Sequence, residues 1–163
     1  LNGVLEYASR FNDSDSPHLT FLQTIKKFLK PEGQIIIAIE NKFGLKYFSG
    51  SKEDHTGIEF DGIGGYEHTN MVKTFGKKEI SKLVMDAGFS DMKFYYPHPD
   101  YKLPSVIYSD EFTPRSTDSL STSNNFDFDT YKFFSEDAVF RGLIKEDMYG
   151  FFANSFLIFA GNK

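Results

Sequence analysis

The segment that most constrains this chain is residues 31–41, where a Pro-Glu-Gly turn leads into an almost uninterrupted apolar run. Residues 34–41 (QIIIAIEN) fit a β-strand whose last two side chains, Glu40 and Asn41, are polar. A strand this apolar predicts burial on both faces, which is typical of an interior parallel strand in an α/β fold. Ligands in such folds bind beyond the carboxyl ends of the strands, so the polar end of this run is the expected site of chemistry.

The pattern around this strand predicts one α/β domain over residues 1–163. Residues 1–7 look like the tip of a strand that runs into a helix. Apolar spacing, with the turn residues that bound it, predicts the remaining elements: helices over 17–30 and 75–87, and strands over 92–96 and 152–160.

The composition narrows the class of partner. The 163 residues are 40% hydrophobic and carry a formal net charge of −5, which argues against nucleic acid, because phosphate backbones are bound by clustered Lys and Arg. The chain has no cysteine, which excludes disulfides and fits a reducing, cytoplasmic location. We expect no membrane span and no signal peptide, since no apolar run is long enough for the first and the start lacks the pattern of the second.

Two long stretches lack helical or strand periodicity. Residues 42–73 hold six glycines with aromatic residues between them and directly follow the apolar strand. We interpret them as a lid or acceptor-recognition loop over the carboxyl edge of the sheet, and the alternative is a disordered surface insertion. Residues 97–150 separate the last two expected strands and are interpreted as an insertion.

Three blocks of this chain resemble, in the right order, the class I S-adenosylmethionine-dependent methyltransferases. They are LNGVLEYA at 1–8, FLKPEGQIIIAIEN at 28–41 and TFGKKEISKLVMDAGFSDMKFYYPHPD at 74–100. These blocks are similar to the segment after strand four, the helix with strand five, and the last helix with strand six of that family. The terminal NSFLIFAGNK is similar to its antiparallel strand seven, so the resemblance implies a partial Rossmann-like sheet of strands four to seven.

A narrower resemblance concerns residues 40–66 (ENKFGLKYFSGSKEDHTGIEFDGIGGY). This stretch is similar to methyltransferase modules associated with bacterial surface-polysaccharide glycosyltransferases, which implies a glycan or small-molecule acceptor. In the family, a short link joins strands six and seven, so residues 97–150 would form an inserted cap over the active-site edge.

The donor side of the family's site has no counterpart in this chain. The glycine-rich loop after strand one and the acid after strand two are missing, so the resemblance implies the C-terminal part of a methyltransferase. We expect S-adenosylmethionine to bind the complete protein, and this fragment to bind none and to be inactive alone. The alternative is a non-catalytic α/β interaction module derived from the same fold. A half-sheet with an exposed edge also predicts a homodimer.

The expected donor-binding and catalytic residues lie at the ends of the apolar segments. The resemblance implies cofactor contacts from Asn2, Leu5 and Glu6, although Asn2 also suits a turn cap and Glu6 a solvated first helical turn. Glu40 is a candidate general base or acceptor-binding group, and the alternative is an exposed strand-end carboxylate. His55 and His68 are candidate acid–base groups, because histidine titrates near neutral pH.

The expected acceptor contacts come from polar, aromatic and glycine residues beyond the strand: Asn41, Tyr47, Gly64, Gly65 and Tyr66. The two glycines let a backbone approach a ligand closely, and an aromatic ring beside them suits a sugar, although a turn with a core tyrosine gives the same pattern. Two histidines thirteen residues apart, without a helical His-x-x-x-His pair, do not predict a metal ion, and we expect none.

Overall fold

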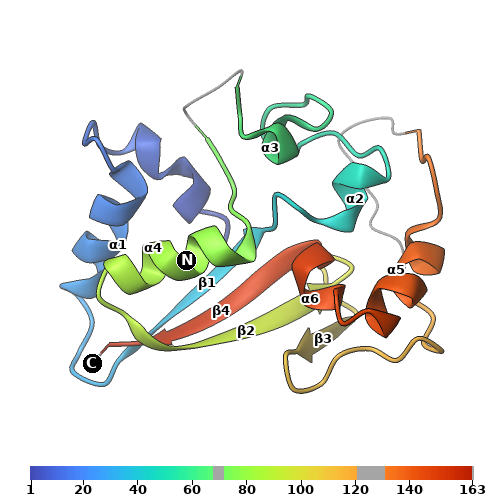
Figure 1. Ribbon diagram of the computed structural model, residues 1–163. Helices are drawn as coiled ribbons and strands as arrows, with labels where there is room; N and C mark the ends of the chain where they lie inside the picture. Colours follow the sequence, from blue (N-terminus) through green and yellow to red (C-terminus); the bar gives the residue numbers. More distant parts are fainter. Residues whose placement is uncertain (68–71, 121–130, 163) are drawn as a thin grey trace.

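The computed structural model describes residues 1–67, 72–120 and 131–162, which form an α/β domain around a four-stranded open sheet (Figure 1). The sheet order is β1-β4-β2-β3, with bounds β1 (Gln34–Glu40), β2 (Ser90–His98), β3 (Val106–Ser109) and β4 (Ser155–Gly161). The helices are η1 (Leu5–Arg10), α1 (Pro17–Lys26), α2 (Leu45–Phe48), α3 (Asp61–Gly64), α4 (Lys77–Asp86), α5 (Glu136–Lys145) and α6 (Tyr149–Phe152). No helix in these ranges is both long and apolar enough to cross a membrane.

The expected strand over 34–41 is confirmed as β1, but the parallel sheet expected around it is not observed. β4 pairs antiparallel with β1 along its whole length, from Gln34 opposite Gly161 to Glu40 opposite Ser155. β4 also pairs antiparallel with β2, and β2 with β3, so every strand pair among the described residues is antiparallel. The prediction failed because an apolar run such as QIIIAIE reports burial and does not specify the direction of its partner.

The outer edge of β1 is bordered by the start of the chain. The amide of Gly3 donates to the carbonyl of Ala38 at 3.0 Å, and the amide of Ala38 donates to the carbonyl of Leu1 at 2.8 Å. These bonds form an isolated parallel bridge between Asn2 and Ala38. β1 therefore has a long antiparallel partner on one edge and a three-residue parallel segment on the other.

The two faces of the sheet are buried to different extents, which corrects the expectation that both would be covered. On one face, Ile37 and Ile158 have no exposed surface and join a core with Leu22 of α1 and Val84 of α4, which pack against each other over the sheet (Figure 1). On the other face, Ile36 is 45% exposed. Alternation along β1 thus places one apolar set in the core and the other at a partly open surface.

The expected helices and strands are found with shifted ends. α1 covers most of the predicted helix 17–30 and continues as turns to Leu29, whereas α4 is slightly shorter than the predicted 75–87. Gly88 follows α4 with φ +90°, the left-handed conformation expected of a glycine that ends a helix. β2 is longer than predicted, and α6 occupies the start of the segment expected to be the last strand.

The two aperiodic stretches contain ordered elements. Among residues 42–67 and 72–73, α2 carries the buried Tyr47, and the turn after α3 carries the buried Tyr66. The stretch 97–150 contributes β3, α5 and α6. Their roles as a lid and a cap stay predictions.

Candidate functional site

The carboxyl end of β1 carries a completely buried carboxylate. Glu40 is the last residue of this strand and has no exposed surface. It lies on the partly open face, where the segment after β2 covers it: Lys102 Nζ is 2.8 Å from Glu40 Oε1. Burial first, and then the charges of Glu40 and Glu6, raise the pKa of the neighbouring Tyr101 hydroxyl. A carboxylate buried this completely needs partners, since its desolvation is costly.

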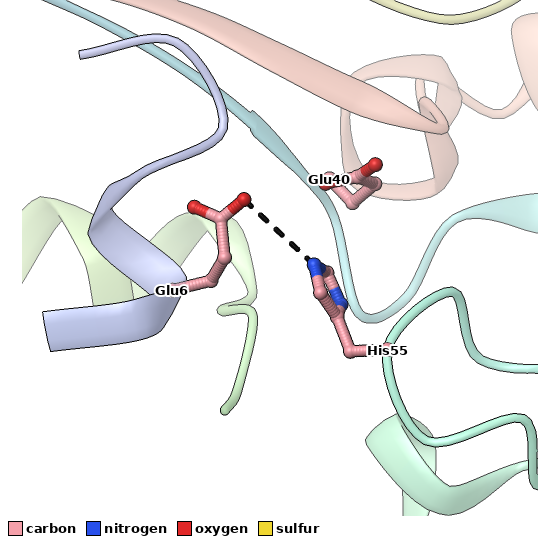
Figure 2. A group of neighbouring side chains, drawn as sticks. All are labelled: Glu6, Glu40 and His55. Carbon is pink, nitrogen blue, oxygen red and sulfur yellow. Dashed lines mark ion pairs between the residues drawn. The ribbon is translucent and has the colours of Figure 1, made fainter. Parts of the chain in front are cut away.

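Two further side chains converge on Glu40 from separate segments (Figure 2). Glu6, on η1, is 1% exposed, and the side chain of His55, from the loop between α2 and α3, is 8% exposed. His55 Nε2 lies 3.7 Å from Glu6 Oε1, and one ligand atom from each of the three residues lies within 4.8 Å of the others. The ring of Tyr7 packs edge-on against His55, with centroids 5.4 Å apart, and closes one side of the group.

Glu53 fixes the orientation of the His55 ring. Its Oε2 accepts hydrogen bonds from the backbone amides of His55 and Thr56, both at 2.7 Å. Its Oε1 lies 3.0 Å from His55 Nδ1 and accepts a hydrogen bond from the Tyr66 hydroxyl at 3.1 Å. Because Glu53 offers only acceptors, Nδ1 carries the hydrogen, and Nε2 is the ring atom that faces Glu6.

The carboxylates around His55 also set its charge. Burial alone would lower the pKa of His55, but the hydrogen bond to Glu53, the ion pair with Glu6 and the charges of Glu53 and Glu40 outweigh it and raise the pKa to about 10. Burial likewise opposes ionisation of Glu53, yet its bonds to His55 and to the backbone bring the pKa of this carboxyl below its ordinary value. At neutral pH the site therefore holds the His55 imidazolium beside the Glu53 carboxylate.

A second buried group adjoins the first. Lys46, 3% exposed, places Nζ 2.6 Å from Asp54 Oδ2 and 3.5 Å from Asp100 Oδ2. Tyr47 donates its hydroxyl to the same Asp54 oxygen at 2.6 Å. Burial would lower the pKa of Lys46, but Asp54, then Glu40 and Asp100, raise it above its ordinary value. Glu40 therefore acts electrostatically on both groups.

Taken together, the two groups hold more acids than bases. The members are the carboxylates of Glu6, Glu40, Glu53, Asp54 and Asp100, and the cations of Lys46, Lys102 and protonated His55. Five formal negative charges face three positive ones, so the end of β1 carries an excess of negative charge inside the domain. Such a site attracts a cation, whether metal, ammonium or sulfonium.

A shallow groove of about 280 Å³ runs along the open face of the sheet beside this site. Its lining is largely apolar and comprises Leu1, Asn2, Ile36, Ala38, Pro97, Tyr101, Pro104, Ile107 and Leu157. Among these residues, Tyr101 is the neighbour of Glu40. A ligand in the groove would lie close to the buried acids.

The structure brings together three of the predicted donor-binding and catalytic residues: Glu6, Glu40 and His55 (Figure 2). Asn2 is exposed in the groove, and Leu5 is fully buried in the core. The remaining catalytic candidate, His68, lies outside the described residues.

The predicted acceptor residues are placed differently from one another. The side chain of Asn41 is fully engaged: its amide donates to the carbonyls of Phe151 and Ala153, and its oxygen accepts from the amide of Phe43. Asn41 thus ties the end of β1 to the segment that leads into β4.

Both predicted tyrosines are buried, and both hydroxyls are bound to site acids. Tyr47 binds Asp54, and Tyr66 binds Glu53 and Thr74. Their rings do not lie open for stacking on a ligand. At Gly64 and Gly65, by contrast, the space where a Cβ would stand is open. The acceptor role of these residues stays a prediction.

Sequence reasoning did not assign a role to Glu53, Lys46, Tyr101 or Lys102. Glu53 was detectable, because the Glu-Asp-His triplet at 53–55 places two acids directly before a candidate histidine. Lys46 gave no signal, since lysine is rarely buried. Tyr101 and Lys102 reach Glu40 only through the fold of the segment after β2.

The chain was compared with protein-family models, with curated proteins and with solved structures, and none of the three comparisons found a match.

Proposed function

We propose that this chain provides the acceptor side and part of the donor side of an S-adenosylmethionine-dependent methyltransferase that acts on a glycan or small-molecule acceptor. The observation that carries the proposal is the convergence of Glu6, Glu40 and His55 at the carboxyl end of β1, beside a groove. In α/β folds with parallel strands, ligands bind at the carboxyl ends of the strands, and the resemblance implies the same for β1.

The strand arrangement supports the proposal. β4 is antiparallel to both β1 and β2, which is what the resemblance expects of a terminal strand seven between neighbours of one direction. The parallel bridge of Asn2 to Ala38 lies where the resemblance expects the end of strand four. β1 lies at the edge of four antiparallel strands, whereas the resemblance expects an interior parallel strand. The experiment below therefore measures methyl transfer directly.

The electrostatics of the site suit this reaction class. The donor is a sulfonium cation, and the excess negative charge around Glu40 favours a cation. The acceptor hydroxyl loses a proton during transfer, and Glu40 is the candidate to receive it, while protonated His55 is the candidate to orient the acceptor oxygen. Most of the rate would come from in-line positioning of donor and acceptor.

The test uses the longest natural polypeptide that contains residues 1–163, incubated with S-adenosylmethionine labelled on its methyl group and with nucleotide sugars or oligosaccharides. We expect label to enter the sugar, and we expect Glu40→Gln to lower kcat at least about 100-fold. Glu136→Gln, a buried carboxylate in another part of the fold, is the matched control and should keep its activity. If that polypeptide neither binds S-adenosylmethionine in calorimetry nor transfers label, the proposal fails. The 163 residues alone are expected to show no micromolar binding.

A second candidate, an interaction module, is favoured by the surface around β3. Ile107 on β3 is 49% exposed, and Leu103 and Phe112 on either side of this strand are 79% and 76% exposed. Apolar side chains gathered at an edge strand favour association, including a homodimer through the half-sheet. Light scattering on the purified chain tests this: a monomer at high concentration excludes the homodimer.

A further inference from the structure

The carboxylates at the end of β1 are buried, but the surrounding protein does not give all of their oxygens a hydrogen-bond partner. Glu6 and Glu40 are 1% and 0% exposed, and Oε2 of each has no hydrogen-bond partner among the described residues. The 3.7 Å between Glu6 Oε1 and His55 Nε2 is an ion-pair distance, too long for a hydrogen bond. Buried polar atoms normally have partners, so unsatisfied carboxylate oxygens that converge on one point indicate a missing cationic group.

We propose that Glu6, Glu40 and His55 bind one divalent transition-metal ion. Two carboxylates and an imidazole form a donor set of mixed hardness, which suits Mn²⁺, Fe²⁺ or Zn²⁺ better than Ca²⁺. Because an imidazole nitrogen coordinates a metal only without its proton, the ion would displace the Nε2 proton of His55, and it would counter the excess negative charge of the site.

The geometry of the three side chains fits a single ion after a small closure. Two donor atoms that each lie about 2.1 Å from an ion are at most about 4.2 Å apart. The Nε2–Oε1 distance of 3.7 Å is already inside this limit, and the whole donor set lies within 4.8 Å. Movement of less than 1 Å therefore brings all three donors to one ion.

The surroundings of His55 are those of a metal-binding histidine. Its Nδ1 is bound to Glu53, and this carboxylate is itself held by two backbone amides and the Tyr66 hydroxyl. An outer carboxylate of this kind fixes the tautomer and points Nε2 at the ion. Lys102, whose side chain is 55% exposed, reaches Glu40 from the solvent side and can withdraw when an ion arrives.

The ion site stands independently of methyl transfer, because its test contains no methyl donor. The chain is treated with a chelator, dialysed, and titrated with Mn²⁺ under calorimetry and electron paramagnetic resonance. We expect one ion per chain, a rise in Tm with Mn²⁺ concentration, and a coupling from one imidazole nitrogen in the spin-echo spectrum.

Four isosteric variants and one control locate the site. Glu6→Gln, Glu40→Gln and His55→Gln should each weaken Mn²⁺ binding at least about 10-fold, and Glu53→Gln should weaken it about 10- to 100-fold through the orientation of His55. Glu136→Gln, with an equally buried carboxylate elsewhere, should bind Mn²⁺ as the parent chain does. Circular dichroism of each metal-free variant establishes that it is folded.

The nitrogen coupling is measured on the parent chain, so it tests the proposal even if a variant fails to fold. Binding without a coupled imidazole nitrogen would overturn the assignment, as would unchanged affinity in the folded Glu40→Gln and His55→Gln chains. Absence of any Mn²⁺ or Zn²⁺ binding to the chelator-treated parent chain would overturn it outright.

Discussion

Two regions of this domain bury carboxylates, and they differ in how the charge is balanced. At the start of α5, Glu136 is 1% exposed, and its Oε1 receives hydrogen bonds from Lys132 Nζ at 2.7 Å and from the Ser49 hydroxyl at 2.9 Å. One acid meets one cation there, at a helix N-terminus that favours negative charge. At the end of β1, the acids outnumber the cations and converge on one point.

The difference distinguishes a structural ion pair from the cation site proposed above. One oxygen of Glu136 also lacks a hydrogen-bond partner, so an unsatisfied atom alone does not distinguish the two regions. The distinction rests on excess charge and on the convergence of donors from three segments. The charges of the first region are balanced as they stand, whereas the second region costs stability unless a cation occupies it.

The largest expected effect is at Glu53, which satisfies four donors inside the excess-charge region. We expect Glu53→Gln to lower the free energy of unfolding by about 3–5 kcal/mol, because it leaves the His55 imidazolium with a broken buried pair. Urea denaturation of the metal-free chain measures it. Glu59→Gln, at a surface carboxylate, is the control and should change stability by less than about 0.5 kcal/mol. A loss below about 1 kcal/mol for Glu53→Gln would contradict the orienting role.

The next prediction compares the same Glu-to-Gln substitution in the two regions. In chelator, Glu136→Gln should cost about 1–3 kcal/mol, since it weakens a charged bond between the buried Glu136 and the partly exposed Lys132. Glu40→Gln should cost less or stabilise the chain, because it removes part of an unbalanced charge and Lys102 can return to water. Denaturation in parallel measures both. If Glu40→Gln lowers the free energy of unfolding more than Glu136→Gln in the absence of metal, the proposed difference between the two regions is wrong.

A pH series compares two buried histidines with opposite shifts. The pKa of His55 is about 10, above its ordinary value near 6.5, so its contribution is complete below pH 6.5 and is lost as pH rises through 10. Burial and Lys73 lower the pKa of His18, so its contribution is lost as pH falls below 6.5. We expect the metal-free chain to lose stability progressively between pH 7 and 10, because the His55 imidazolium gives up its proton over this range.

Thermal unfolding of His55→Gln and His18→Gln assigns each limb of that series. The first variant should flatten the alkaline limb and the second the acidic limb. An alkaline loss that survives in His55→Gln would assign it to the lysines instead.

The smallest effect is expected for a short ion pair at the surface. Lys82 Nζ lies 2.5 Å from Asp86 Oδ2, closer than the acid–base pairs of either buried region, but their side chains are 73% and 46% exposed. Lys82→Ala should change the free energy of unfolding by less than about 0.5 kcal/mol, because water screens the pair. A larger loss in urea denaturation would mean that distance, not burial, ranks the ion pairs of this domain.

The sequence was sufficient to predict the local helices and strands and part of the site, but not which strands pair with each other. The apolar run and its bounding turn were sufficient for β1, and helical spacing was sufficient for α1 and α4. Glu40 was predicted as a site residue because it is the polar residue at the carboxyl end of the predicted strand. The resemblance predicted an antiparallel terminal strand, but its pairing along β1 was missed, because β4 comes from residues far along the chain and register between distant strands leaves no local pattern.

The orientation of the site acids was also beyond sequence reasoning. Glu53 binds amides two and three residues later, which requires a tight turn that no periodicity indicates. Lys46 lies on α2, a helix of four residues that is too short to show an amphipathic period. Tyr66 has φ +63°, a backbone state uncommon for a residue with a side chain, and it brings the hydroxyl to Glu53.

The position of β4 between β1 and β2 has a consequence for synthesis. β4 is translated after both of its neighbours in the sheet, so the edges of β1 and β2 that pair with it stay open until residue 161 leaves the ribosome. During that interval two apolar strand edges are open to other chains, and binding by a chaperone or by a second nascent copy competes with closure.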